Sequence, residues 1–304
     1  MSVLLQLPRA AIVNLPNFFI VGTQKAGTTS LYHYLGQHPD IFVSPIKEPG
    51  YFAPEQTPEK HRFSWERYQA LFADVSHEQA IGEATATYLW SHTAAQNIAA
   101  HIPSARIIIV LRNPIERAFS QYLHMRSAGA TQRSFRDQIN HALTTPPGEF
   151  GLEWPFLELG RYGEQLPRYF ASFPRSQIHI ALYEDFERSA IQLAQELFAF
   201  LGVAADFTPD VSHRHNVPRV HRLPGLVSAL RKSAAWPHLR QLVPVGLRGG
   251  TLSLLAHRRR PLCIDRSDRA FLAEYYADDI ARLSSLLQRD FRHWLAPSPP
   301  QHPH

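Results

Sequence analysis

The chain has 304 residues, of which 44% are hydrophobic, and these are spread along the whole sequence. That much apolar material excludes global disorder and suffices for one large α/β domain, expected at residues 1–296, with a disordered tail at 297–304. The net charge is +5 without a long run of Lys or Arg, so the charge is compatible with an anionic ligand and does not indicate a nucleic-acid-binding protein.

The cysteine content and the N-terminus bound the cellular setting. Cys263 is the single cysteine, so no intrachain disulfide can form and nothing requires an oxidising compartment. The apolar stretch 1–8 is too short to span a membrane, and Arg9 and Asn14 prevent it from continuing as a longer apolar segment. We therefore expect a soluble, cytoplasmic protein without a membrane span.

The first predicted unit is a strand, a loop and a helix. Residues 17–22 form a short apolar run that is typical of a buried parallel strand. A loop up to Gly27 follows, and residues 28–37 then predict a helix. This order places a glycine-bounded loop at a helix N-terminus, where backbone N–H groups bind phosphate.

Strands and helices continue to alternate along the chain. Apolar runs predict further strands at 40–43, 79–82, 106–111 and 177–183. The predicted helices span residues 91–101, 113–127, 162–173, 191–201 and 266–289. The predicted irregular segments are 49–65, 144–156 and 208–262. This alternation favours an α/β fold in which helices cover both faces of a central parallel sheet.

Gly22 and Gly27 have the Gly-x4-Gly spacing of a phosphate-binding loop. In a nucleoside triphosphatase, Lys and then Ser or Thr follow the second glycine, whereas here two threonines follow and the lysine, Lys25, comes earlier. At this earlier position, the charge of Lys25 would lie near the end of the ligand from which the leaving group departs. The predicted ligand-binding residues of the loop are Gln24, Lys25, Ala26, Gly27, Thr28, Thr29 and Ser30.

The apolar run 106–111 argues against a metal-dependent nucleoside triphosphatase. Such an enzyme needs a carboxylate after a later strand to position Mg²⁺. Arg112 follows this run instead, and it would repel a metal and attract a second phosphate. The sequence therefore predicts a phosphate site without a metal, although an ordinary glycine turn is the alternative for the loop taken alone.

Four segments resemble motifs of the sulfotransferases that use 3′-phosphoadenosine 5′-phosphosulfate (PAPS), and the two main motifs lie in the expected order. Residues 19–31 resemble the 5′-phosphosulfate loop, and residues 105–122 resemble the 3′-phosphate motif. Lys47-Glu-Pro-Gly-Tyr-Phe52 and Gly82-Glu-Ala-Thr-Ala-Thr-Tyr88 match two further pieces. The resemblance spans about residues 17–202 and favours the carbohydrate branch, with its heparan sulfate N- and O-sulfotransferases and bacterial relatives. It implies a P-loop-like three-layer fold with PAPS as co-substrate.

The resemblance also implies roles for residues beyond the loop. Arg112 and Ser120 would hold the 3′-phosphate, for which the planar arginine fork can donate two hydrogen bonds. Tyr183 follows a strand at a position near the adenine or the 3′-phosphate, with a core tyrosine as the alternative. Arg219, in the basic stretch 213–222, would belong to a loop that closes over PAPS, with a solvated basic loop as the alternative.

Glu48 is the predicted general base, because a hydroxyl or amine acceptor loses a proton as it attacks sulfur. The resemblance implies this role through the context Glu-Pro-Gly-Tyr-Phe. The alternative is an exposed carboxylate paired with Lys47. Lys25 is expected to stabilise charge on the leaving phosphate oxygen, and His92 and His124 are the next candidate bases.

The sequence departs from the family pattern at Ala84. Many members have a lysine after the residue that corresponds to Glu83, and it stabilises charge at the transferring group. Here Lys25 alone, or Lys47, would have to supply that charge. The favoured function is metal-independent sulfuryl transfer to a glycan, a glycolipid or another hydroxyl-bearing molecule. A small-molecule kinase using ATP and Mg²⁺ and a nucleotide-binding protein that has lost transfer are the alternatives.

Overall fold

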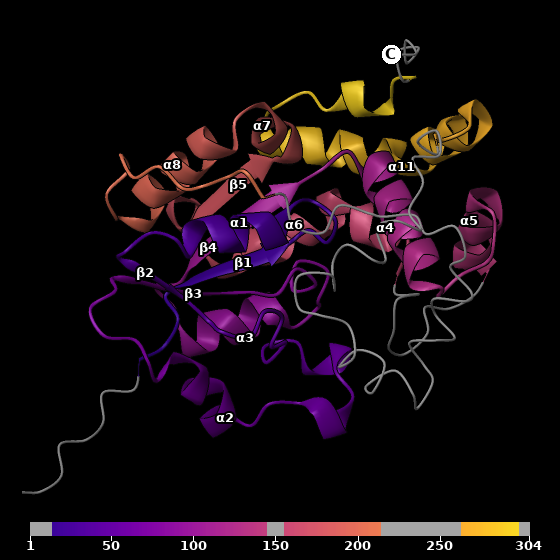
Figure 1. Ribbon diagram of the computed structural model, residues 1–304. Helices are drawn as coiled ribbons and strands as arrows, with labels where there is room; N and C mark the ends of the chain where they lie inside the picture. Colours follow the sequence, from indigo (N-terminus) through magenta and orange to yellow (C-terminus); the bar gives the residue numbers. More distant parts are fainter. Residues whose placement is uncertain (1–13, 145–154, 214–262, 298–304) are drawn as a thin grey trace, which may run out of the picture.

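A sheet of five parallel strands forms the centre of the computed structural model, which describes residues 14–144, 155–213 and 263–297 (Figure 1). The strands are β1 (Phe18–Gly22), β2 (Ile41–Val43), β3 (Ala80–Ala84), β4 (Arg106–Leu111) and β5 (Ile178–Leu182). Their order is β2-β3-β1-β4-β5, and every neighbouring pair is parallel. The chain reverses its direction of winding beside β1, and open α/β sheets bind ligands outside the carboxyl ends of the strands at such a point.

Helices cover both faces of this sheet (Figure 1). One face packs against α1 (Thr28–Leu35), α7 (Tyr183–Arg188) and α8 (Ala190–Leu201). The other packs against α2 (Trp65–Gln69), α3 (Ala94–His101), α4 (Pro114–Ala128), α5 (Phe135–Thr144), α6 (Tyr162–Ser172) and α11 (Arg266–Leu287). The predicted three-layer α/β fold is therefore confirmed.

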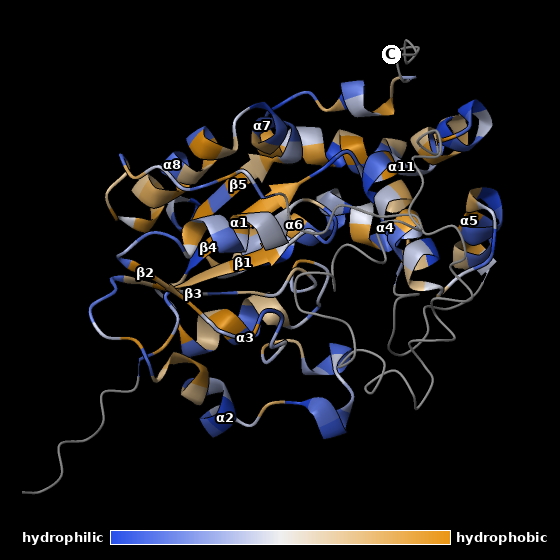
Figure 2. Ribbon diagram, in the orientation of Figure 1, coloured by the Kyte–Doolittle hydropathy of each residue, from blue (hydrophilic) through white to orange (hydrophobic). Residues whose placement is uncertain are grey.

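The central strands are apolar on both sides because both sides are covered. In β1, Phe19 and Val21 enter the core beneath α3 and α6, whereas Phe18 and Ile20 enter the core beneath α1 and α8. Figure 2 shows the central strands mainly in the hydrophobic colours. This double burial fixes the strands, and with them the loops at their carboxyl ends.

Some predicted boundaries are wrong for local reasons. The helix expected from Ser91 begins at Ala94, because the Ser91 hydroxyl accepts the N–H groups of Thr93 and Ala94 at 3.1 and 2.9 Å and forms a turn. Strand β3 continues beyond Gly82 to Ala84, where it still pairs with β1. The segment predicted to be irregular at 49–65 contains two short 3₁₀ turns, and α2 begins at its last residue, Trp65.

The C-terminal helix α11 packs on the same core as β4 and α4. Arg269 forms an ion pair with Glu116 of α4. Asp279 accepts the backbone N–H groups of Gly163 and Glu164, in the first turn of α6, at 2.9 and 3.1 Å. This late segment therefore completes a layer that earlier segments begin.

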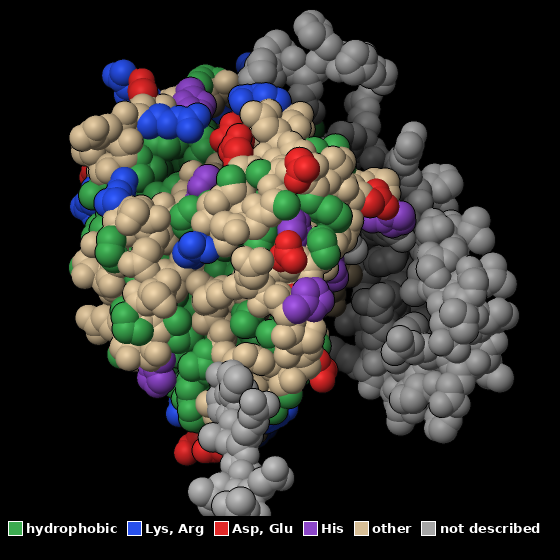
Figure 3. Space-filling model, turned by 90° about the vertical axis from the view of Figure 1, so that its left-hand side faces the viewer, with side chains coloured by type: hydrophobic (Ala, Val, Ile, Leu, Met, Phe, Trp, Pro, Cys, Tyr) green, Lys and Arg blue, Asp and Glu red, His purple; other side chains and the backbone are tan. Residues whose placement is uncertain are grey.

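The surface drawn in Figure 3 carries basic and acidic side chains, with histidines between them. On this face the described residues thus present both signs of charge, unlike the single-sign stripe of a nucleic-acid-binding surface. Within the described ranges, no helix has both the length and the apolar character needed to cross a membrane.

Candidate active site

The loop after β1 turns into α1 through two glycines. A Cβ at Gly22 would come within 2.6 Å of the Leu89 Cβ, so the backbone approaches too closely for a side chain. Gly27 has a φ of 83°, a left-handed value that glycine adopts without steric cost, and α1 begins at Thr28. The N–H groups of the first turn of α1 and its positive dipole end therefore meet the loop, as the predicted strand–loop–helix unit requires.

Lys25 lies in this loop among other charged groups. Its carbonyl oxygen accepts a hydrogen bond from Arg112 Nη1 at 2.8 Å. Burial, followed by the charges of Arg112 and Arg117, lowers the pKa of Lys25 to about 8, while the charge of Glu48 opposes the shift. The ammonium group of Lys25 therefore lies among positive charges, and a bound anion would stabilise its charged form.

Arg112 is fixed where it leaves β4. Its carbonyl oxygen accepts the Tyr162 hydroxyl at 2.8 Å, and its guanidinium carbon lies 4.3 Å from the centre of the Tyr183 ring. A Cβ at Gly27 would lie 3.4 Å from the same ring. Arg112, Tyr183 and the predicted phosphate loop therefore form one packed unit. The guanidinium has five N–H donors, more than its bond to Lys25 uses.

Helix α4 begins at Pro114, two residues after Arg112. The Asn113 side chain caps it by accepting the N–H groups of Ile115 and Glu116 at 3.0 and 3.4 Å. Ser120 lies two turns into this helix and is half-buried. Its shared role with Arg112 at a 3′-phosphate stays a prediction.

The same helix brings His124 to the site. Burial and then the charge of Lys25 lower the pKa of His124, so its imidazole is neutral at pH 7 and can accept a proton. Arg117 is fully buried and structural. His92 lies elsewhere, with its Nδ1 3.1 Å from Arg168 Nη1.

Glu48, the predicted general base, lies in the segment 47–52, which passes the carboxyl end of β3. We name residues 47–52 the catalytic segment after that predicted role. The N–H of Glu48 donates to the Ala84 carbonyl at 2.8 Å. Its side chain is 46% exposed and forms an ion pair with Lys47 at 2.6 Å. The pairing considered as an alternative is therefore present, but the carboxylate remains accessible and its charge acts on Lys25.

The predicted site residues come together in part. Lys25, Arg112, Tyr183 and Glu48 form one cluster at the carboxyl ends of the strands. Arg219 and most of the basic stretch 213–222 lie outside the described residues.

Sequence reasoning missed the residues that hold the catalytic segment. Thr85 Oγ1 and the Tyr88 hydroxyl accept the N–H groups of Gly50 and Phe52 at 3.4 and 3.1 Å. Both acceptors belong to the stretch 82–88 that matched the family, and this match was the available signal. A matching stretch does not reveal which N–H group a hydroxyl meets.

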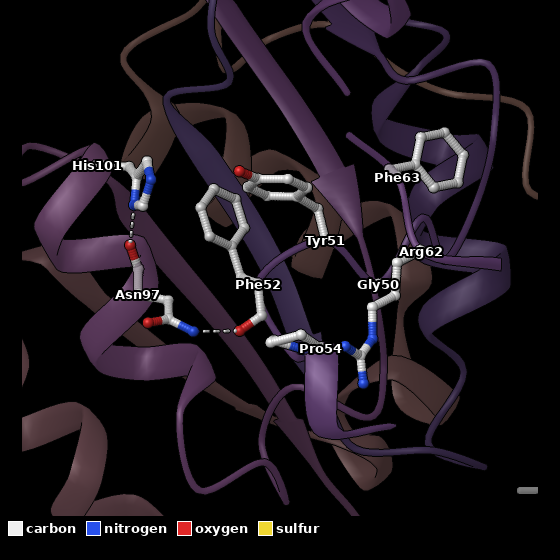
Figure 4. Close-up of a pocket in the computed structure, with 8 residues that line it drawn as sticks. All are labelled: Gly50, Tyr51, Phe52, Pro54, Arg62, Phe63, Asn97 and His101. Carbon is white, nitrogen blue, oxygen red and sulfur yellow. Dashed lines mark hydrogen bonds between the residues drawn. The ribbon is translucent and has the colours of Figure 1, made fainter. Parts of the chain in front are cut away.

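A cavity of about 240 Å³ opens beside the catalytic segment (Figure 4). Its walls include Tyr51, Phe63, Arg62 and His101. Most of these residues belong to the segment 49–65, which was predicted to be irregular. The cavity offers aromatic faces, a guanidinium and an imidazole.

Comparison with known proteins decides the family. Residues 16–208 match the profile described as "Sulfotransferase family". The chain belongs to the sulfotransferase family. Bifunctional heparan sulfate N-deacetylase/N-sulfotransferase 4 of Mus musculus is 29% identical to this sulfotransferase, covering 91% of it and 30% of the mouse protein. Bifunctional heparan sulfate N-deacetylase/N-sulfotransferase 2 of Homo sapiens is 30% identical, and the match covers 90% of this chain and 30% of the human protein.

Solved structures place this sulfotransferase in the same fold. A sulfotransferase from Alicyclobacillus acidocaldarius matches with a TM-score of 0.74 and 31% identity, covering 93% of this chain and all of that one. A mouse sulfotransferase complexed with PAP shares the fold at a TM-score of 0.51 and 12% identity, and the match covers 90% of this chain and 88% of that one. Membership of the sulfotransferase family and the resemblance to heparan sulfate-type and bacterial sulfotransferases are therefore confirmed. The chain spans about a third of the length of the mammalian relatives.

Proposed function

We propose that this sulfotransferase transfers a sulfuryl group from PAPS to a hydroxyl or amine of a carbohydrate. One observation carries the proposal: Lys25, Arg112 and Glu48, from three separate segments, form one electrostatic cluster at the carboxyl ends of the strands. Such a cluster combines a site for two phosphates with a carboxylate that can take a proton.

The arrangement suits PAPS, which has phosphate groups at both the 3′ and 5′ positions. In this proposal the phosphate loop and the first turn of α1 hold the 5′-phosphosulfate, and Arg112 with Ser120 holds the 3′-phosphate. Tyr183 would keep the guanidinium in place through its ring contact. The mouse sulfotransferase that shares this fold binds PAP, the product of PAPS after transfer, which supports the choice of co-substrate.

The proposed step is an in-line transfer. The acceptor oxygen or nitrogen attacks sulfur, the bond from sulfur to the 5′-phosphate oxygen breaks, and the acceptor proton moves to Glu48. Lys25 and the loop N–H groups stabilise the electron pair left on the phosphate oxygen, so positioning and electrostatics suffice without a metal ion. Lys47, beside Glu48, takes the place of the family lysine that is missing at Ala84.

The acceptor class is proposed from the relatives. Their names specify heparan sulfate or carbohydrate, including human carbohydrate sulfotransferase 15, which is 27% identical over 62% of this chain and 44% of its own length. The cavity beside the catalytic segment offers aromatic and polar walls to such an acceptor. A transfer screen with labelled sulfate over glycans, glycolipids, lipids and small alcohols should label the glycan class first.

Glu48→Gln tests the base. Glutamine cannot take the proton, so kcat should fall at least about a hundredfold, while PAP should still stabilise the variant in a thermal-shift assay. Normal turnover of the variant would show that Glu48 is not the base, and His124→Asn would then be the next variant.

The ligand itself separates this function from its alternatives. PAPS and PAP should raise Tm without added metal, because binding to the folded state alone stabilises it. Stabilisation by ATP with Mg²⁺ only would contradict the proposal. Stabilisation by PAP without transfer to any acceptor class would indicate a binding protein that has lost catalysis.

A further inference from the structure

The backbone of Glu48 adopts a conformation that needs outside support. Its φ is 62°, in the left-handed region, where a residue with a side chain is less stable by about 1–2 kcal/mol. Gly50, two residues on, has a φ of 69°. Such a backbone persists only where its surroundings determine it, and it then often serves a function.

That support comes from the end of β3 and the turn after it, residues 84–89. The catalytic segment donates three alternate N–H groups to this turn, in the pairs Glu48–Ala84, Gly50–Thr85 and Phe52–Tyr88, at 2.8, 3.4 and 3.1 Å. Only the last two pairs use side-chain acceptors. A substitution at Thr85 or Tyr88 can therefore loosen the segment without altering Glu48 itself.

The turn is also bound to the strand that carries the phosphate loop. Thr85 N donates to the Ile20 carbonyl at 3.1 Å, and Leu89 N donates to the Val21 carbonyl at 2.7 Å. Both carbonyls belong to β1, directly before Gly22. Residues 84–89 thus set the distance between the catalytic segment and the phosphate loop.

Phe52 is the fixed point at the far end of the catalytic segment. Its N–H donates to the Tyr88 hydroxyl, and its carbonyl accepts from Asn97 Nδ2 at 2.9 Å (Figure 4). Its buried ring meets the Phe19 ring of β1 edge-on, with 5.6 Å between the ring centres. Both backbone polar groups of Phe52 are therefore satisfied by side chains.

A buried acidic side chain that the proposed chemistry does not use, Glu83, lies next to Tyr88. Glu83 is 1% exposed and faces the Tyr88 hydroxyl, although neither carboxyl oxygen completes a well-aligned hydrogen bond with a described residue. Burial raises the pKa of Glu83 to about 8, so the carboxyl is neutral at pH 7. The titratable groups that interact with it are Tyr68 of α2, Tyr88 and Tyr169 of α6.

We propose that Tyr88, supported by Glu83, is a positioning residue that fixes the Glu48 carboxylate relative to the phosphate loop. It acts through the backbone of Phe52, and Glu83 keeps the Tyr88 hydroxyl in place from below. A neutral acid suits this task, because an ionised carboxylate in this apolar site would be unstable. The inference rests on the proposed role of Glu48 as base.

Tyr88→Phe is the direct test. It leaves the Phe52 N–H without its acceptor, so kcat should fall at least about tenfold, because small displacements of a catalytic group slow the reaction strongly. KM for PAPS should change less than about twofold, since the phosphate loop is untouched. The matched control is Tyr68→Phe, whose buried hydroxyl meets no hydrogen-bond partner among the described residues, and its kcat should stay normal.

Two substitutions of Glu83 test the support without removing the tyrosine. Glu83→Gln keeps a neutral polar group of the same shape and should retain kcat within about twofold at pH 7, whereas Glu83→Leu should lower kcat as Tyr88→Phe does. Equal kcat in the two Glu83 variants would overturn the supporting role. The two Glu83 variants therefore test the support of Tyr88 by Glu83 even if Tyr88→Phe does not fold.

A double-mutant cycle separates positioning from a general structural effect. If Tyr88 acts through Glu48, Tyr88→Phe should cause no further loss of kcat in a Glu48→Gln background. An equal loss in both backgrounds, or normal kcat for Tyr88→Phe alone, would overturn the inference. Full activity of Glu48→Gln by itself would instead contradict the proposed function, so the two failures are distinguishable.

Discussion

Lys25 shows how a single side chain is tuned by its surroundings. Burial and two arginines disfavour its charge, and Glu48 favours it. The arginines that would attract an anionic ligand thus also destabilise the charge of the loop lysine. A bound phosphosulfate would reverse that effect by adding negative charge beside the ammonium group.

This balance predicts an alkaline limit to the reaction. The pKa of Lys25 is lowered to about 8, so the ammonium is charged below that pH and neutral above it. We expect kcat/KM for PAPS to fall as the pH rises through about 8, because kcat/KM follows the free enzyme. Lys25→Arg keeps its charge, so its lower kcat/KM should show no such fall, as a pH profile from 6 to 10 would reveal.

A control is needed because the pKa of Glu83 is also raised to about 8. Glu83→Gln removes that titration and should retain the alkaline fall if Lys25 causes it. A fall that persists in Lys25→Arg and disappears in Glu83→Gln would assign the limit to Glu83 instead.

At the scale of elements, the join between β1 and α1 places the proposed phosphate loop. Apolar periodicity predicted both elements, and the glycine spacing predicted the loop between them. The short helices α2 and α5 were not predicted, because tertiary packing of aromatic residues such as Tyr68 and Phe135 stabilises them more than any local signal. Element boundaries depended on side-chain hydrogen bonds in the preceding turns, such as those that the Ser91 hydroxyl accepts.

Gly27→Ala tests the join. At a φ of 83°, alanine should destabilise the fold by about 1–2 kcal/mol, and the new Cβ would lie 3.4 Å from the Tyr183 ring, in ordinary contact. The strained start of α1 should also weaken PAP binding by up to roughly tenfold. Urea unfolding and calorimetric titration with PAP measure the two effects.

The chain offers a matched control at Gly202, which ends α8 at a φ of 77° with similar space for a Cβ. Gly202→Ala should lose similar stability and leave PAP affinity unchanged, since it lies away from the loop. Equal losses of PAP affinity in both variants would mean that the effect is general instability.

At the scale of the whole molecule, a late helix completes the site's support. Asp279 of α11 accepts two N–H groups in the first turn of α6. Tyr162, in the same turn, donates to the Arg112 carbonyl. The C-terminal helix thus supports the arginine of the proposed phosphate site through α6, although it lies far away in sequence.

Asp279→Ala would leave the N–H groups of Gly163 and Glu164 without their acceptor. We expect a loss of about 1–3 kcal/mol in the free energy of unfolding, measured by urea denaturation. Asp279→Asn keeps an acceptor oxygen and should lose less. Asp278→Ala, at the exposed neighbouring position, should change stability little, and an equal effect of the two alanine substitutions would contradict the capping role.

The sequence by itself determined the parallel α/β fold, the glycine-bounded loop between β1 and α1 and the family, because strand periodicity, glycine spacing and ordered motifs are local properties. Only the tertiary structure decided which groups meet. Three interactions connect segments that are far apart in sequence. They are the charge interactions that lower the pKa of Lys25, the hydrogen bond from Phe52 N to the Tyr88 hydroxyl, and the hydrogen bonds that Asp279 accepts from α6. Crossovers of a parallel sheet bring such segments together, so no pattern within one segment could reveal them.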